Sequence, residues 1–265
     1  MQGRPSPGPN RRQGLALFAT EAVIVKIPRR GFEDSAHIEA MASPAAGRLG
    51  IPVASLIALD TSRSLIPRDV TLWQRLYGDH PEGTSPVWLD VARQLAVLHD
   101  AELAWPAHTV RDDRPVRHAA LPAVAQKLHH LDAFRDVSAW AERLGAYCAP
   151  AGIKTSIHGD VHRFNVFSGP GGELLALLDW GDAGWGDPAY DLARAPLEAL
   201  APMLAAYEAV SRRGLGPDAR GRILRYRLGR LLRWAQRQSE APGDLTAFLV
   251  FARHLPDDWR PYGLG

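Results

Sequence analysis

The sequence predicts a mixed α/β (α+β) fold in two lobes, a small β-rich lobe followed by a mostly helical one. Short runs rich in β-branched residues occupy the N-terminal part, as in Val23 to Ile27. Apolar residues at helical spacing dominate from Trp88 onward. With 265 residues, of which 46% are hydrophobic, the chain can bury the core of one or two compact lobes. We expect the lobes to meet near Tyr77, at residues 1–77 and 78–265.

Four strands and one helix are expected in the N-terminal lobe. The helix is predicted from Phe32 to Ala42, because the first helix breaker is the pair Ser43-Pro44. Lys26 lies inside the second strand, among valine and isoleucine. Lysine occurs only three times in the chain, which favours a role for its compact charge over that of an edge-strand lysine that prevents aggregation. The strands are predicted at residues 14–20, 21–28, 51–59 and 70–76.

The C-terminal lobe is expected to combine helices with one β-hairpin. Trp88 to Asp100 has the period of an amphipathic helix. Phe164 to Ser168 and Glu173 to Asp179 are predicted strands, joined by a turn of three glycines and one proline. Asp187-Pro188 is typical of a helix start, since aspartate accepts from free backbone donors and proline has no donor there. A loop is expected at residues 101–117, and further helices up to His130 and at residues 138–147.

Arginines alternate with apolar residues near the C-terminus. Seven arginines between Arg220 and Arg237 are interleaved with leucine, isoleucine and Trp234 at helical spacing. We expect a helix that buries its apolar stripe, Trp234 included, with the arginines in solvent or paired to other elements. The alternative is a surface that binds RNA or phosphate. Because the net charge is only +2, no nucleic-acid partner is expected.

The segment His158 to Asn165, followed by Asp179, carries the clearest chemical pattern. It has the layout of a metal-assisted phosphoryl-transfer site, where one carboxylate orients a hydroxyl while an amide oxygen and a second carboxylate hold Mg²⁺. Asp160, Asn165 and Asp179 fit these three positions. The predicted hairpin would carry Asn165 and Asp179 on neighbouring strands, so that the three oxygen ligands can converge.

This pattern has a second explanation, because Asp, Asn and Gly are common turn residues. A site is favoured by a second block, Asp179 to Ala193, at the separation that one hairpin allows. Together the two blocks resemble the aminoglycoside phosphotransferase family, with its H-G-D-x-H-x-x-N loop, its D-W strand end and its G-D-P-x-x-D-L-A helix start. The resemblance is specific from Ile157 to Ala193 and rests on the order of elements elsewhere.

The resemblance implies a protein-kinase-like fold and transfer of the γ-phosphate of ATP or GTP to a hydroxyl group of a small molecule. In such a site Asp160 would orient and deprotonate the acceptor, while Asn165 and Asp179 would bind Mg²⁺. Most of the rate would come from positioning and from charge neutralisation.

The N-terminal lobe is expected to bind the nucleotide. Lys26 would neutralise the α- and β-phosphates, and Glu39 on the next helix would hold it there, with Glu33 as the rival acid. By analogy with the family, backbone groups near Trp73 and Arg75 would bind the purine edge in the hinge.

One departure from the family pattern concerns the loop that covers the phosphates. Its only glycine-rich candidate, Gly8 to Gly14, does not match G-x-G-x-x-G. A catalytically silent binding protein with a kinase-like fold is therefore an alternative. The intact set of Asp160, Asn165 and Asp179 argues against it.

Four residues are expected to support the site. Asp191 would accept hydrogen bonds from the backbone of the catalytic loop, and Asp187 would cap its helix. His158 and His162 are given similar roles, because no Cys or His partner lies at zinc-site spacing. His99, at a helix end, is expected to make structural hydrogen bonds.

The acceptor is predicted to be an aminoglycoside-like antibiotic, because acidic side chains are expected around its pocket. The alternative is a metabolite kinase of the same fold, acting on choline, homoserine or a sugar. The single cysteine, Cys148, excludes an internal disulfide, and no signal peptide or membrane-length apolar run is found, so a cytoplasmic protein without a membrane partner is expected. The expected acidic lining consists of Asp112, Asp113, Asp187, Glu198, Glu208, Asp257 and Asp258.

Overall fold

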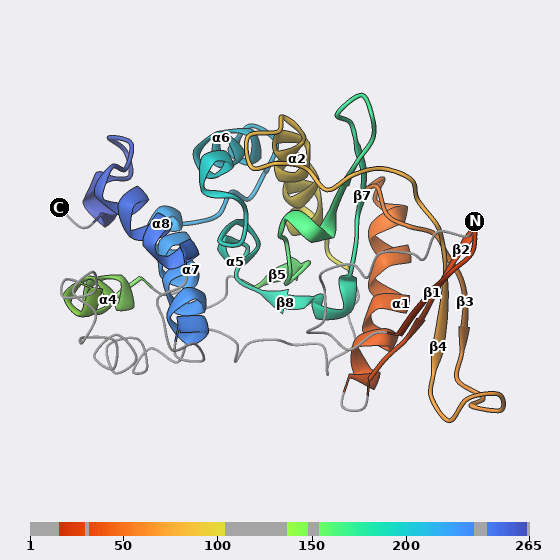
Figure 1. Ribbon diagram of the computed structural model, residues 1–265. Helices are drawn as coiled ribbons and strands as arrows, with labels where there is room; N and C mark the ends of the chain where they lie inside the picture. Colours follow the sequence, from red (N-terminus) through yellow and green to blue (C-terminus); the bar gives the residue numbers. More distant parts are fainter. Residues whose placement is uncertain (1–15, 30–31, 104–136, 148–153, 236–242, 264–265) are drawn as a thin grey trace, which may run out of the picture.

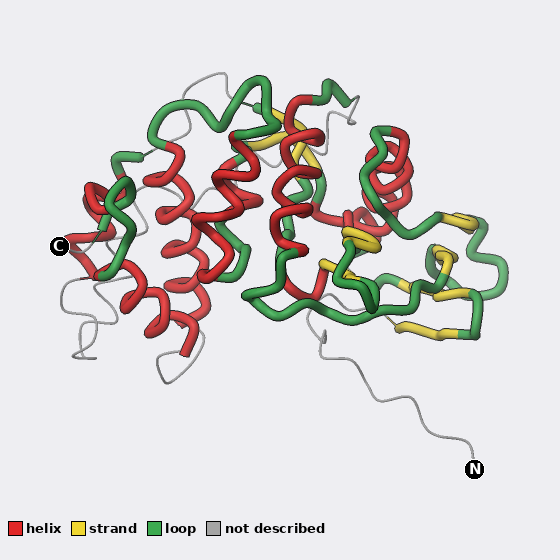
Figure 2. The backbone as a smooth tube through the Cα atoms, turned by 90° about the horizontal axis from the view of Figure 1, so that it is seen from above, coloured by secondary structure: helices red, strands yellow, loops and turns green. Residues whose placement is uncertain are grey.

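The strands and helices separate into a small β-rich lobe and a larger, mostly helical lobe, which confirms the predicted fold class (Figure 1). The computed structural model describes residues 16–29, 32–103, 137–147, 154–235 and 243–263. In Figure 1 the sheet and helix α1 form one end of the molecule, while α4, α7 and α8 form the other. Seen from above in Figure 2, most of the helices lie towards the end marked C, and most of the strands lie towards the opposite end beside one further helix.

The predicted strands of the small lobe form one antiparallel sheet in the order β1-β2-β4-β3. Strand β2 has a neighbour on each side, so Lys26 pairs with Leu17 on one strand and with Thr71 on another. The edge-strand explanation for Lys26 is therefore wrong. The strands are β1 (Ala16–Ala19), β2 (Val23–Ile27), β3 (Leu56–Asp60) and β4 (Val70–Gln74).

Helix α1 (Glu33–Arg48) continues past its predicted end and contains Pro44. A proline inside a helix removes one backbone hydrogen bond and normally stops the helix. Here Ala42 and Ala46 are fully buried, and the Ser43 hydroxyl donates to the Ala54 carbonyl at 3.4 Å. Tertiary packing therefore outweighs the local helix-breaking signal.

The larger lobe contains six described α-helices and two small antiparallel sheets. The predicted hairpin is confirmed, with Val166 opposite Leu177 in strands β6 and β7. The helices expected up to His130 lie outside the described residues. No helix within the described ranges is both long and apolar enough to cross a membrane. The elements are α2 (Val87–Asp100), α4 (Val137–Gly145), β5 (Thr155–Ile157), β6 (Val166–Ser168), β7 (Leu174–Leu177), β8 (Gly184–Gly186), α5 (Ala189–Leu192), α6 (Leu197–Glu208), α7 (Ala219–Ala235) and α8 (Gly243–Arg253).

Helix α7 is the predicted arginine-rich helix, and it buries more than its apolar stripe. Its leucines and Ile223 belong to the core, and Trp234 packs against the core while staying partly exposed. Arg222 and Arg225 are also fully buried. They pair with other elements, since Arg222 binds Asp187 and Arg225 donates to the Tyr147 carbonyl. The expectation that the arginines lie in solvent or pair with other elements is confirmed for these two in its second form.

Candidate active site

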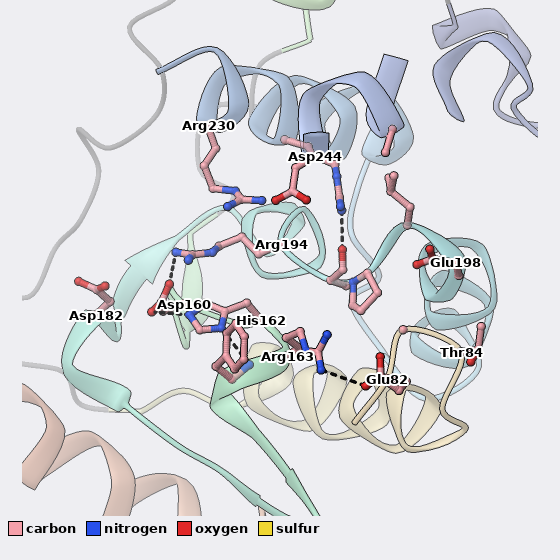
Figure 3. Close-up of a pocket in the computed structure, with 17 residues that line it drawn as sticks. Glu82, Thr84, Asp160, His162, Arg163, Asp182, Arg194, Glu198, Arg230 and Asp244 are labelled. Atoms are coloured by element: carbon pink, nitrogen blue, oxygen red, sulfur yellow. Dashed lines mark hydrogen bonds and ion pairs between the residues drawn. The ribbon is translucent and has the colours of Figure 1, made fainter. Parts of the chain in front are cut away.

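The loop that follows β5 presents Asp160 at the bottom of a cavity (Figure 3). Gly159 has φ +82°, and a Cβ there would overlap the Asp182 carbonyl, so only glycine fits this turn. Asp191, which is fully buried, accepts from the backbone amides of His158 at 2.8 Å and Gly159 at 2.7 Å. These are the contacts of a carboxylate that holds the loop in shape.

The two histidines of the loop have local partners. The His158 ring accepts from the Asp160 amide through Nδ1 at 3.2 Å and donates through Nε2 to the Leu178 carbonyl at 3.0 Å. Burial lowers the pKa of this ring, which therefore stays neutral. His99 lies behind the loop, with Asp191 at 3.1 Å and the Tyr207 hydroxyl at 3.0 Å, a structural role as expected.

The Asp160 carboxylate is surrounded by donors. Asn165 Nδ2 lies 3.0 Å from Oδ2, His162 Nε2 lies 3.4 Å from the same oxygen, and Arg194 forms an ion pair with Oδ1. Burial would raise the pKa of Asp160, but the His162 hydrogen bond and the Arg194 charge outweigh it and hold the pKa well below its usual range. Asp160 is therefore a carboxylate at neutral pH, ready to accept a proton or to orient a hydroxyl.

Asp179 has the opposite environment. It adopts φ +62°, and its carboxylate accepts no hydrogen bond as a helix cap. Burial raises its pKa to about 7, against the opposing charge of Lys26 and with help from Glu39 and Asp160. The neighbouring Leu178 amide donates to the Asn165 carbonyl at 2.8 Å, so Asp179 and Asn165 lie at the same end of the hairpin.

A divalent cation fits this pair. A carboxylate close to other acids is stabilised when a cation binds, and carboxylate and amide oxygens are ligands that Mg²⁺ accepts. Among the described residues no group of three or more His, Cys, Asp and Glu is placed to hold a metal ion. Nucleotide phosphates and water would have to complete the coordination of Mg²⁺, which is its usual arrangement with nucleotides.

Lys26 and Glu39 form an ion pair of 2.5 Å between β2 and α1. The rival acid, Glu33, lies in the first turn of α1. Both members of the pair line a cavity of about 260 Å³ together with Trp73, Arg75 and Asp179. This cavity therefore brings together Lys26, Glu39, Trp73 and Arg75, the four side chains that the sequence assigned to nucleotide binding.

Within that cavity, Trp73 and Arg75 are held by contacts of their own. The Trp73 ring lies under the Lys26 ammonium, 5.4 Å from ring centroid to Nζ. Arg75 makes two hydrogen bonds to the turn between β1 and β2. Its Nη1 donates to the Thr20 carbonyl at 2.7 Å, and its backbone amide donates to the Ala22 carbonyl at 2.9 Å. The glycine-rich segment expected to cover the phosphates lies outside the described residues.

A second cavity, of about 870 Å³, opens above Asp160 (Figure 3). Of the described residues in the predicted acidic lining, only Glu198 lines it. Asp187 instead accepts from Arg222 Nε at 2.9 Å, the Tyr226 hydroxyl at 2.9 Å and the Ala189 amide at 3.0 Å, so it caps α5 and anchors α7. The remaining described acids pair with Arg220 or Arg260 outside the cavity: Glu208, Asp257 and Asp258.

Three arginines of this cavity were missed by sequence reasoning. Arg194 follows the D-L-A segment directly and pairs with Asp160, so its position after the motif was the available signal. Arg227 and Arg230 come from α7, and nothing in the sequence indicates that this helix lies above Asp160. The cavity therefore depends on segments that lie far apart in the sequence.

Comparison with known proteins agrees with this geometry. The model of the phosphotransferase enzyme family matches residues 16–198, which is more than half of the chain. The chain therefore belongs to this family and is a phosphotransferase that acts on a hydroxyl group of a small molecule. No curated protein matches the chain by sequence.

Solved structures share its kinase-like fold. Aminoglycoside 2'-phosphotransferase-IIIa, solved with GDP, superposes with a TM-score of 0.63 at 14% identity, covering 94% of this chain and 90% of that one. A choline/ethanolamine kinase family protein from Mesorhizobium loti gives a TM-score of 0.62 at 17% identity, covering 94% and 87%. Macrolide 2'-phosphotransferase type I gives 0.51 at 19% identity, covering 85% and 81%. At these identities the likeness establishes the fold.

Proposed function

We propose that the protein transfers the γ-phosphate of ATP or GTP to a hydroxyl group of a small molecule that occupies the cavity above Asp160. One observation carries the proposal. The carboxylates of Asp160 and Asp179 belong to one short segment and line two different cavities, about 870 and 260 Å³ in volume. Acceptor and nucleotide can therefore bind on opposite sides of the same catalytic loop.

On the nucleotide side, Lys26 contacts the non-transferred phosphates while Glu39 fixes its ammonium. Asn165 and Asp179 would hold Mg²⁺, which supplies positive charge to the phosphates when it is bound. In the hinge, the amides of Gln74 and Arg75 are engaged with Ser55 and Ala22. We assign the purine contact to the next backbone group, that of Leu76, which lines the same cavity.

On the acceptor side, Asp160 orients the attacking hydroxyl and accepts its proton as the bond to phosphorus forms. Asn165 and His162 hold one carboxylate oxygen of Asp160 in place. The other oxygen, Oδ1, faces Arg194. An aminoglycoside-like antibiotic as acceptor, with a role in resistance, and a metabolite such as choline, homoserine or a sugar stay sequence predictions at this stage.

The proposal is tested by two measurements on the full chain. In the first, Mg-ATP and Mg-GTP are added while melting is followed, and at least one must raise Tm, because a ligand of the folded state stabilises it. In the second, transfer of labelled γ-phosphate to a panel of hydroxyl compounds is compared between wild type and Asp160→Asn. Nucleotide binding without transfer to any compound, or equal transfer by both proteins, would overturn the proposal.

A further inference from the structure

The wall of the acceptor cavity around Asp160 is built from arginines. Arg227 and Arg230 lie three residues apart on α7 and so share one face of that helix. Arg194 follows α5, and Figure 3 shows it between Arg230 and Asp160. Three guanidinium groups from two distant segments therefore line the same cavity as the proposed base.

These guanidinium groups have donor capacity that the protein leaves unused. The Nε–H groups of Arg194, Arg227 and Arg230 are buried and have no hydrogen-bond partner within the described part of the chain. Arg227 uses Nη1 on the carbonyls of Ala193 and Ala195, which are neutral acceptors. A buried charged donor without a partner is costly, so these groups are suited to a ligand that supplies acceptors.

The pKa values of the cavity arginines also favour an anionic ligand. Burial and the positive charge of Arg230 together lower the pKa of Arg227 to about 9, against the opposing charges of Asp244 and Glu198. Burial likewise lowers the pKa of Arg230 to about 10, with the charge of Arg194 adding to the effect. Repulsion among like charges at close range is relieved when an anion binds between them.

Two other arginines of α7 differ from these because each has a protein carboxylate as its partner. Arg222 binds both carboxylate oxygens of Asp187, and Arg220 binds Asp258 at 2.8 Å. Arg227 has no such carboxylate partner in the described residues and relies on backbone carbonyls. The contrast indicates that the fold does not require a protein carboxylate at Arg227 and Arg230.

Five acids also line the cavity. Glu82, Glu198 and Asp244 are exposed to solvent, where water screens them, whereas Asp160 is buried and paired with Arg194, and Asp182 is half-buried. Glu82 is also paired with Arg163 at 3.1 Å at the mouth. Among the described residues, Arg227 and Arg230 therefore have no carboxylate partner, although Asp160 and Asp182 add negative charge to the same wall.

We infer that the acceptor is a hydroxyl compound with an anionic group, a carboxylate or a phosphate, which binds to Arg194, Arg227 and Arg230 while its hydroxyl lies over Asp160. The inference rests on the proposed function and names its substrate class. Guanidinium forks match both anions with paired hydrogen bonds. A polycationic aminocyclitol would meet like charges on this wall, and a neutral macrolide would leave the arginines unpaired.

The same geometry gives the anion a second effect. Arg194 forms an ion pair with Oδ1 of Asp160, whereas Asn165 donates to Oδ2. When the acceptor anion binds Arg194, Oδ1 is released to the hydroxyl. The hydroxyl oxygen then bonds to the γ-phosphorus, the bond from that phosphorus to the β–γ bridging oxygen breaks, the nucleoside diphosphate leaves, and the proton passes to Asp160.

The test uses hydroxyl compounds that share a sugar ring and differ in charge. They belong to a wider panel of hydroxyl compounds that is also grouped by charge. Glucuronate and glucose 6-phosphate supply the carboxylate and the phosphate, glucose is neutral, and glucosamine and kanamycin are cationic. Binding is measured by melting of the protein loaded with magnesium and a non-hydrolysable ATP analogue, so that anions cannot occupy the nucleotide site. Phosphate transfer is measured with labelled ATP.

The matched variants are the double substitution Arg227→Gln with Arg230→Gln and, as control, Arg220→Gln on the same helix outside the cavity. We expect transfer to anionic compounds. Their KM should rise about tenfold or more in the double variant, with nucleotide KM unchanged and the control like wild type. Circular dichroism and the melting shift with nucleotide show that each variant is folded.

Three results separate the inference from the proposed function. Transfer that favours cationic or neutral compounds overturns the inference and leaves the proposed function standing. Binding of anions that depends on Arg227 and Arg230, without transfer to any compound, supports the anion site and counts against the proposed function. The inference is overturned if the protein neither transfers phosphate to anionic compounds nor binds them through Arg227 and Arg230.

Discussion

Asp160 and Asp179 lie in one segment of 20 residues and have opposite environments. Asp160 is surrounded by donors from Asn165, His162 and Arg194, and its pKa is held below the usual range in spite of burial. Asp179 is buried beside other acids, and its pKa is raised to about 7. The protein itself therefore stabilises the charge of Asp160. The charge of Asp179 is stabilised most when a ligand brings a cation to it.

The largest effect is expected on phosphate transfer. Asp160→Asn and Asp179→Asn should each reduce kcat by about a thousandfold, because a positioned base and a cation ligand each contribute on that order. Both substitutions remove charge with little change in volume. Initial rates with saturating nucleotide measure the effect, and a rate near wild type in either variant would contradict the assigned role.

A smaller loss is expected at Lys26. Lys26→Ala should lower kcat/KM for nucleotide by about a hundredfold, since its contact is with phosphate, and should leave the KM of the acceptor unchanged. Lys154→Ala is the control, because Lys154 is exposed and lines neither cavity. If both lysine variants behaved alike, Lys26 would have no role in nucleotide binding.

Stability should respond to pH in opposite directions at the two carboxylates. The pKa of Asp160 is depressed in the folded state, so its charge stabilises the protein above the pKa of the unfolded chain. Asp160→Asn should therefore lower Tm at pH 8, and the loss should shrink as the pH falls below about 4. The pKa of Asp179 is raised, so its charge costs stability at pH 8, where Asp179→Asn should raise Tm.

At pH 5 the folded Asp179 is protonated, and the gain from Asp179→Asn should largely disappear. Without nucleotide, each change is expected to be about 2–4 °C, the shift that about 1 kcal/mol causes in a chain of this size. Melting curves at pH 3, 5 and 8 measure both variants against wild type. The same sign of shift at pH 8 for the two variants would remove the basis of the comparison.

The smallest effect is expected at a third carboxylate, Asp187, which supports the fold. Tyr226→Phe removes one of its hydrogen bonds and leaves the Arg222 ion pair in place. Unfolding by urea should show a loss of about 1.5 kcal/mol, the usual contribution of a hydrogen bond to a charged group, with kcat unchanged. A change in kcat without a change in stability would place Asp187 in the site itself.

Much of the site could be predicted from the sequence because it is local. The loop, the hairpin and the helix start all lie between Ile157 and Ala193, so the spacing of residues limits where Asp160, Asn165 and Asp179 can be. The strands of the small lobe were also predictable, since β-branched runs mark them. Pro44 shows the limit of such local signals, because buried neighbours keep α1 intact around it.

The acceptor cavity was not predictable, because its walls come from segments far apart in the chain. Glu82, Arg194 and Arg230 meet only after the helices have packed. The predicted acidic lining failed for the same reason, as Asp187 turns towards α7 instead of the cavity. In α7, arginines occur on several faces, so the sequence does not tell which of them are buried.

The most direct test compares binding of Mg-nucleotide to Asp160→Asn and Asp179→Asn by calorimetry, with and without magnesium. We expect Asp160→Asn to bind as wild type does and to keep its dependence on magnesium. Asp179→Asn should lose this dependence, and its affinity for Mg-nucleotide should fall by about tenfold or more. Loss of magnesium dependence in Asp160→Asn, or its retention in Asp179→Asn, would contradict the division of roles between the two carboxylates.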